Sequence, residues 1–190
     1  MTTRTPLTRA RLATVGAELA DEVGFEHVTA SEVARRCGVR VASLYSHVRD
    51  ADDLRALVCL LALDELADRA SAAVAGRAGA EALAALAGAY RDYARAHPGR
   101  YAAMRHRLDP ATAAASAGPR HADLTRAALR GYGLDADGET HAVRLFGGLV
   151  HGFVTLELAG AFDHSDPSPE VSWEWSLTAL DATLTGWSTR

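Results

Sequence analysis

Hydrophobic residues recur at intervals of three and four along nearly the whole chain, and no segment alternates convincingly between apolar and polar positions. The first pattern is typical of amphipathic helices and the second of half-buried strands. We expect the first helix to begin after its N-cap Thr8 and to end at Val23, with Gly24 as a C-terminal cap. Its apolar face comprises Leu12, Val15, Leu19, Ala20 and Val23. The pattern therefore predicts an all-α protein.

Two short helices are expected next. The stretch Thr29-Ala30-Ser31-Glu32 has the form of a capping box, a hydroxyl residue followed three positions later by Glu. The helix that it opens is expected to stop at Gly38, and after a tight turn a second short helix should run from Val41 to His47. Asp50 is then expected to cap a long helix, whose first-turn acidic residues suit the positive end of the helix dipole.

The remaining periodicity predicts about nine helices in all. The later ones are expected at about 80–97, 99–107, 119–132, 138–160 and 169–187. Pro98-Gly99 and the two prolines within 163–169 mark breaks between them. Residues 109–118 are rich in alanine and lack an apolar stripe, so we expect a mobile loop there.

The spacing within residues 29–48 favours a helix-turn-helix. Ala34 is small enough to let two helices approach, Gly38 can turn the chain, and Leu44 can anchor the second helix from beneath. The outer face of that second helix would then enter the major groove of DNA. It comprises Arg40, Val41, Ala42, Ser43, Tyr45 and His47.

This segment resembles the tetracycline-repressor (TetR) family of bacterial regulators. The resemblance covers about residues 8–58 and rests on the joint spacing within Val28–Val39, Ser43–Val48 and Leu54. It implies a three-helix DNA-binding domain in residues 1–50 and a helical ligand-binding and dimerisation domain in residues 51–190. The function that it implies is that of a ligand-responsive regulator, most often a repressor, which binds a palindromic double-stranded DNA operator as a homodimer.

The resemblance also assigns roles to individual positions. Thr29 would hold a phosphate, and Tyr45 and His47 would contact the DNA backbone, which adds affinity irrespective of sequence. The residues facing base edges would be Arg40, Val41, Ala42 and Ser43. A guanidinium can pair bidentately with guanine, whereas small apolar side chains can touch a thymine methyl group. Ala51 stands where the family commonly has lysine, so affinity should depend more on Arg49 and the N-terminal arginines.

A second distinctive segment is the glycine-interrupted apolar stretch Phe146–Leu158. Glycines weaken a helix by about 1 kcal/mol each relative to alanine, so they should permit a close approach by a neighbouring helix or ligand. The stretch resembles a His-Gly-Phe (WHG-like) subgroup of the family, which implies that helices 138–160 and 169–187 form the homodimer interface. An apolar stripe in the last helix suits that role, with an intramolecular core stripe as the alternative. It comprises Trp173, Leu177, Leu180, Leu184 and Trp187.

Four residues are candidates for binding a small-molecule effector. His151 lies among apolar residues, where a hydrogen-bonded structural role is the alternative. Tyr90, Met104 and Phe146 could line a pocket between the middle helices, or could simply be core. A largely apolar pocket with a few polar groups would suit a small hydrophobic molecule.

Charge adds a weak signal. The 190-residue chain has a net charge of −4, which argues against general polyanion binding, and all its basic residues are arginine. Residues 1–49 carry seven arginines against five acidic residues, whereas residues 50–190 carry thirteen against nineteen. The small positive excess therefore coincides with the segment expected to bind DNA.

Several classes of function lack support in the sequence. No apolar stretch reaches the ~20 residues that cross a bilayer, and no signal-peptide core follows the N-terminus, so we expect a cytoplasmic protein without a membrane partner. Cys37 and Cys59 have no metal-site spacing and are expected to be buried thiols. No cofactor, metal or nucleophile motif is present, so we expect no enzyme, no catalytic residue and no cofactor. The alternative to a regulator is a helical protein-interaction module without specific DNA binding.

Overall fold

A computed structural model describes residues 6–187 of the chain. Within that range the protein consists of ten α-helices and two short 3₁₀ helices, without a strand, which confirms the all-α prediction. The α-helices are α1 (Arg9–Val23), α2 (Ala30–Cys37), α3 (Val41–Leu44), α4 (Ala51–Val74), α5 (Gly79–Ala96), α6 (Pro98–Ala103), α7 (Pro110–Ala115), α8 (Gly118–Leu129), α9 (Ala136–Leu158) and α10 (Pro169–Trp187). The 3₁₀ helices are η1 (Phe25–His27) and η2 (Arg130–Tyr132).

The chain divides into two compact units by its packing. The first contains the residues up to Glu65 together with Ala96–Ala117, and the second contains Leu66–Arg95 and the residues from Gly118 onward. Helix α4 begins in the first unit and ends in the second. The expected domain boundary between residues 50 and 51 stays a prediction.

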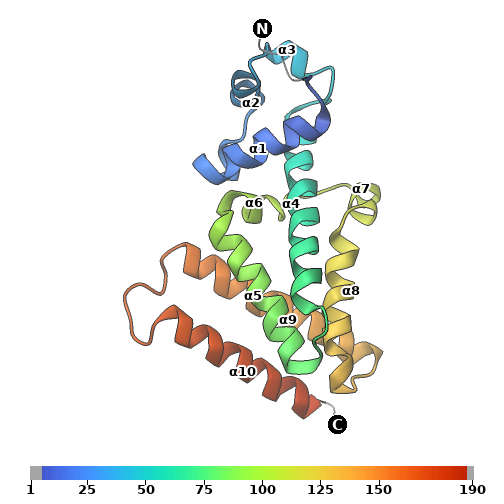
Figure 1. Ribbon diagram of the computed structural model, residues 1–190, viewed down its shortest axis with the longest axis vertical. Helices are drawn as coiled ribbons and strands as arrows, with labels where there is room; N and C mark the ends of the chain where they lie inside the picture. The colour runs from blue at the N-terminus through green and yellow to red at the C-terminus, as the bar shows by residue number, and fades with distance from the viewer. Residues whose placement is uncertain (1–5, 188–190) are drawn as a thin grey trace. The chain divides into compact units, whose positions relative to one another are not determined.

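In the first unit, α1 lies between α2 and α6 (Figure 1). Thr8 caps α1 by accepting a hydrogen bond at Oγ1 from the Arg11 N–H at 3.1 Å, and Gly24 ends the helix, as the sequence predicts. The core beneath these helices is aliphatic, and each fully buried side chain of this size stabilises the fold by about 1.5–3 kcal/mol. Its largest members are Leu12, Leu19, Val28, Val33, Leu44, Leu54 and Val58.

The expected loop at 109–118 is wrong, because residues Pro110–Ala115 form helix α7. The Asp109 carboxylate caps this helix: it accepts hydrogen bonds from the N–H groups of Ala111 and Thr112 at 3.1 and 3.0 Å. Proline at the first helical position adds a preset φ. The cap and the proline specify the helix locally, whereas its exposed alanines leave no apolar stripe to reveal it.

The second unit contains a buried ion pair. The Arg91 guanidinium pairs with the Glu157 carboxylate, with 2.9 Å between Arg91 Nε and Glu157 Oε2, and lies 5.1 Å from the ring centroid of Trp173. Arg95 also donates to Glu157, at 2.7 Å, and these hydrogen bonds lower the pKa of the Glu157 carboxyl. The network joins α5 to α9 and α10, which follow one another as a helical hairpin (Figure 1).

Two further features bear on the expectations from sequence. Both cysteines are buried free thiols, as predicted, and burial raises the pKa of Cys59 to about 11. No helix within residues 6–187 is both long and apolar enough to span a membrane.

Candidate nucleic-acid interface

The turn between α2 and α3 has the geometry that the sequence predicts. The Thr29 hydroxyl accepts a hydrogen bond from the Glu32 N–H at 3.3 Å and so caps α2. Gly38 ends the helix in the left-handed region, with φ at 68°, where a glycine avoids the cost that a side chain would add. The Val39 N–H then bonds the Ala34 carbonyl at 3.0 Å, which closes the helix end and redirects the chain into α3.

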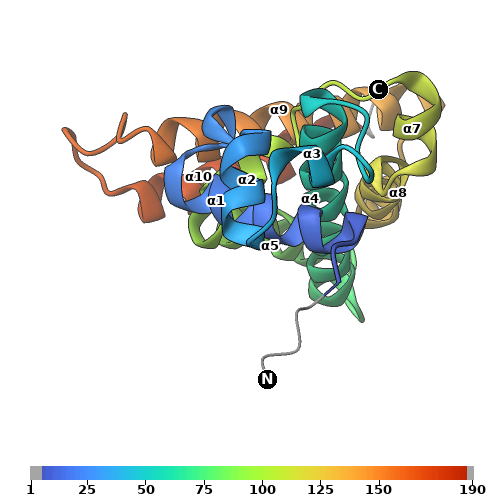
Figure 2. The same ribbon diagram turned by 90° about the horizontal axis from the view of Figure 1, so that it is seen from above.

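Helix α3 is anchored from beneath. Leu44 is fully buried, and Ala34 on α2 is fully buried as well, so the two helices pack closely at the small residue. Figures 1 and 2 show α2 and α3 as neighbouring short helices in the first unit. The helix is shorter than expected, since it ends at Leu44, and the segment from Tyr45 to His47 forms a turn.

Most of the predicted DNA-contacting residues lie in the segment from Arg40 to His47, whereas Thr29 lies at the start of α2. Arg40, Ala42, Ser43 and Tyr45 are exposed, while Val41 and His47 are half-buried. The Arg40 carbonyl accepts the Ser43 N–H at 2.9 Å, but the Arg40 side chain forms no hydrogen bond or ion pair with any residue that the structure describes. Nearly half of the Tyr45 surface is exposed, so its phenol group is accessible. This segment can therefore present a cation, a hydroxyl and a phenol to a partner.

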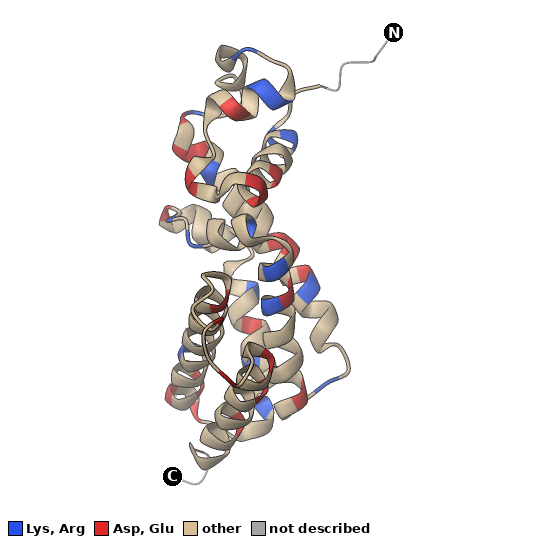
Figure 3. Ribbon diagram, turned by 90° about the vertical axis from the view of Figure 1, so that its left-hand side faces the viewer, with Lys and Arg blue, Asp and Glu red and all other residues tan. Residues whose placement is uncertain are grey.

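Opposite charges largely pair on α2. Arg35 bonds Glu32 through Nε at 3.0 Å, and Arg36 bonds Glu22 through Nη2 at 2.6 Å. Figure 3 shows basic and acidic residues interleaved on the helices of the first unit. Because these arginines are closely paired with neighbours, the cations best placed for DNA phosphates are Arg40 and Arg49. Arg49 Nε lies 3.8 Å from Asp53 Oδ2, a looser contact, and the Arg49 side chain is 83% exposed.

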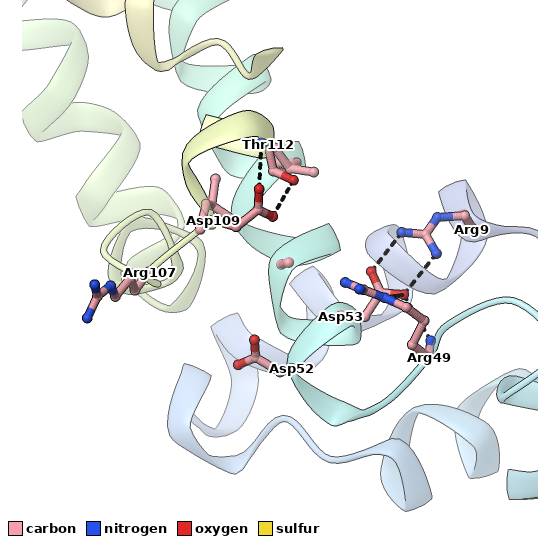
Figure 4. A pocket seen from close by; sticks show the side chains of 10 residues that line it. Arg9, Arg49, Asp52, Asp53, Arg107, Asp109 and Thr112 are labelled. Carbon is pink, nitrogen blue, oxygen red and sulfur yellow. Dashed lines mark hydrogen bonds and ion pairs between the residues drawn. The ribbon is translucent and has the colours of Figure 1, made fainter. Parts of the chain in front are cut away.

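Arg49 lies beside the ion pair of Arg9 with Asp53 (Figure 4). Arg9 Nη2 and Nη1 donate to the two carboxylate oxygens of Asp53 at 2.9 and 3.1 Å, and Nη1 also donates to the His47 carbonyl at 2.6 Å. The Asp53 carboxylate accepts the backbone N–H of Arg49 at 2.9 Å. The Arg9 hydrogen bonds are the main cause that lowers the pKa of Asp53 to about 2. No local sequence pattern reveals this pair, because its members lie far apart in the chain.

Residues around this ion pair line a cavity of about 530 Å³ in the first unit. Its polar lining is largely engaged already: Asp109 is the cap of α7, and Asp53 is paired with Arg9 (Figure 4). The arrangement therefore favours a structural role for these charges over a ready-made ligand site.

A smaller cavity, of about 170 Å³, lies in the second unit and contains three of the four predicted effector-binding residues. Tyr90 Oη and His121 Nδ1 are 2.6 Å apart, and the Tyr90 ring makes edge contacts with Phe146 and His151 at centroid distances of 6.3 and 6.0 Å. Met104 follows α6 in the first unit and is not among the residues that line this cavity. His121 was missed because a histidine on an amphipathic helix carries no signal of its own.

A capped helix, a glycine turn and an anchored helix with an exposed polar face define a DNA-binding protein of the helix-turn-helix class. Comparison with protein families agrees. Residues 12–56 match the model described as bacterial regulatory proteins, tetR family, and residues 83–180 match the model described as tetracyclin repressor-like, C-terminal domain. The chain belongs to the TetR family, and it is a DNA-binding transcriptional regulator.

Individual relatives support the same assignment. The chain is 37% identical to the uncharacterized HTH-type transcriptional regulator Rv0681 of Mycobacterium tuberculosis, over 77% of this chain and 68% of the relative. It is 28% identical to the HTH-type regulator YobS of Bacillus subtilis, over 87% of each chain. Its fold is similar to that of ActR from Streptomyces coelicolor in complex with (S)-DNPA, with a TM-score of 0.71, 18% identity, and 97% and 100% coverage of the two chains. Membership of the His-Gly-Phe subgroup stays a prediction.

Proposed function

We propose that this regulator is a repressor that binds a palindromic operator as a homodimer and is released by a small-molecule effector. The observation that carries the proposal is the presence, in one chain, of the exposed α3 segment and of a separate aromatic cavity around Tyr90. The first suits the major groove and the second suits a ligand.

In this proposal the DNA contacts divide into two kinds. Thr29, Tyr45, His47 and Arg49 contact phosphates and hold the protein in register. Base edges are read by the residues from Arg40 to Ser43, with Arg40 as the main determinant of specificity. Because Arg40 is exposed and unpaired within the described chain, its guanidinium can pair with a guanine without first breaking an internal bond.

Helices α9 and α10 are proposed to pair with the same helices of a second copy. Several large apolar side chains of these helices are exposed, including Trp175 at 76%, Leu156 and Val171. A Cβ atom added at Gly148 or Gly152 would meet nothing within 4 Å, so these glycines are available for the close approach that the sequence predicts. A two-fold dimer of this kind would read an operator with matching two-fold symmetry.

The effector is proposed to occupy the cavity around Tyr90. Apolar side chains from α8 and α9 form most of its lining, and Tyr90, His121 and His151 supply a few polar groups. This composition suits a small aromatic molecule with one or two polar substituents. ActR, of the same fold, has been crystallised with the small molecule (S)-DNPA, which supports a ligand-binding role for this domain.

The proposal is tested by selecting bound fragments from a random pool of duplex DNA with the full chain. We expect an inverted repeat whose half-sites lie about one helical turn apart, and affinity for it that falls steeply with salt. Operator-sized DNA that bound no better than a scrambled duplex would overturn specific DNA binding. The double variant Arg40→Ala, Tyr45→Phe distinguishes a repressor from the alternative, a protein-interaction module. A repressor would lose binding to its operator, whereas an interaction module would still bind its protein partner.

A further inference from the structure

The Arg9 guanidinium lies where three segments of the first unit meet. Arg9 is the first residue of α1, His47 ends the turn after α3, and Asp53 lies in the first turn of α4. The guanidinium bonds the His47 carbonyl at 2.6 Å. It also bonds both carboxylate oxygens of Asp53 (Figure 4). One side chain thus links the start of α1 to the end of the segment from Arg40 to His47.

The carboxylate of Asp53 is fixed from several directions. Its side chain is only 7% exposed, and it accepts the Arg49 N–H at 2.9 Å besides the two bonds from Arg9. Its own backbone N–H donates to Asp50 Oδ1 at 2.8 Å. A buried charge held by this many bonds leaves little freedom to the backbone that it contacts.

We propose that the Arg9–Asp53 pair positions the segment from His47 to Arg49 for DNA binding. The pair holds this segment at two backbone atoms, the carbonyl oxygen of His47 and the amide nitrogen of Arg49. The inference rests on the proposed DNA interface, in which His47 and Arg49 contact phosphates. Arg9 and Asp53 are positioning residues: they act through those two neighbours.

The direction in which one substitution changes DNA affinity distinguishes this positioning role from an effect of charge alone. DNA is a polyanion, so removing a carboxylate from the binding region strengthens binding if charge alone matters. Asp53→Asn removes the same charge but loosens the segment, so positioning predicts weaker binding. Asp52→Asn is the matched control, because Asp52 is the preceding residue on the same helix turn, is 77% exposed and points away from Arg9 (Figure 4).

A second substitution separates positioning from a direct contact of Arg9 with phosphate. Arg9→Lys keeps the positive charge but loses the planar fork that reaches Asp53 and His47 together. Positioning predicts weaker binding, because a lysine cannot hold the Asp53 carboxylate and the His47 carbonyl together. A directly contacting cation would instead keep nearly full affinity as lysine.

The experiment measures fluorescence anisotropy of the full-length protein on the duplex selected from the random pool. We expect Asp53→Asn and Arg9→Lys each to weaken binding about five- to tenfold, as loss of one or two ordered phosphate contacts would. Asp53→Glu should recover part of the loss, and Asp52→Asn should bind as well as the wild type or better. Binding is measured at a temperature at which circular dichroism shows every variant folded.

The inference is overturned if Asp53→Asn binds as tightly as Asp52→Asn, or if Arg9→Lys binds like the wild type. If Asp53→Asn fails to fold, Arg9→Lys alone decides. If no preferred duplex emerges from the pool, the proposal of a specific operator fails. The positioning role is then measured on an arbitrary duplex at low salt, because phosphate contacts do not depend on base sequence.

Discussion

Gly99 packs directly onto the backbone of Ala20: a Cβ atom at Gly99 would lie 1.9 Å from the Ala20 carbonyl oxygen. This contact joins α6 to α1 within the first unit. The Asp21 carboxylate reinforces it by accepting the Arg100 N–H at 2.9 Å and by lying 3.0 Å from His97 Nδ1. Helix α1 is therefore held against α6 by a close approach that requires glycine at position 99. The neighbouring hydrogen bonds of Asp21 add to this contact.

We expect Gly99→Ala to lower the free energy of unfolding by about 3 kcal/mol, at the upper end for overpacking, since the obstacle is backbone that cannot rotate away. Urea unfolding followed by circular dichroism measures the change. Gly88→Ala is the control, because a Cβ there meets no atom within 4 Å and alanine favours the helix by up to about 1 kcal/mol. Equal stabilities for the two variants would contradict the close approach.

The same residue shows how far the sequence could predict the fold. Pro98-Gly99 marks a helix break from local chemistry alone, as do the cap Thr29 and the turn glycine Gly38, and the structure confirms all three. The reason for glycine at position 99 lies on Ala20, distant in the chain, and no local pattern reveals it. Helix α7 was missed because periodicity detects a buried face, and α7 has none.

The candidate sites also contain residues that a local sequence pattern reveals and residues that only the tertiary fold brings together. The exposed segment from Arg40 to His47 is contiguous, so its spacing was sufficient to predict it. The cavity around Tyr90 takes residues from three helices, and only some of them were anticipated; Met104 belongs to the other unit. The bonds of Arg9 to His47 and Asp53 depend on the tertiary fold and on no short motif.

Arg40→Ala should cost about 1–3 kcal/mol of binding on the selected operator and relax the preference at one base pair of each half-site. On a scrambled duplex the loss should be much smaller, because base-edge contacts are absent there. Titrations on both duplexes at one salt concentration, with Tyr45→Phe as the comparison, measure the difference. A phosphate contact from Tyr45 predicts equal losses on both duplexes. If Arg40→Ala lost the same binding free energy on both duplexes, Arg40 would contact the DNA backbone and not a base.

If α9 and α10 form the proposed homodimer interface, Trp175→Asp should yield a folded monomer at micromolar concentration. Trp175 is 76% exposed in the single chain, so its replacement costs little intramolecular packing, but a charge at a pairing surface would be desolvated without a partner. Sedimentation velocity measures the molecular mass. Val23→Asp introduces the same charge at another exposed apolar residue, on α1, and should leave the mass unchanged. A Trp175→Asp protein that sedimented as a dimer would show that α10 lies outside the interface.

The Asp53 carboxyl should make stability depend on pH in a defined window. Its pKa is about 2 in the folded protein against an ordinary value of 3.8, chiefly because Arg9 bonds the carboxylate. A group whose pKa is lowered by folding contributes stability that is fully present above the unfolded pKa and is lost as the pH falls toward the folded pKa. The shift corresponds to about 2 kcal/mol, reduced to roughly 1–2 kcal/mol because Arg9 is half exposed and solvent screens the pair.

We therefore expect the stability difference between the wild type and Asp53→Asn to be constant from pH 6 down to about 4, and to be roughly halved by pH 3. Urea unfolding at each pH measures it. Asp52→Asn provides the reference: that carboxylate is exposed, lies 3.4 Å from His106 Nε2 and forms no bond with Arg9, so its difference from the wild type shows what a neighbouring carboxylate contributes without Arg9. If the difference in free energy of unfolding between the wild type and Asp53→Asn stayed constant down to pH 3, the bond with Arg9 would not stabilise the ionised carboxylate. The pair would then be too weak to hold the backbone at His47 and Arg49, so this measurement tests the positioning role without any DNA.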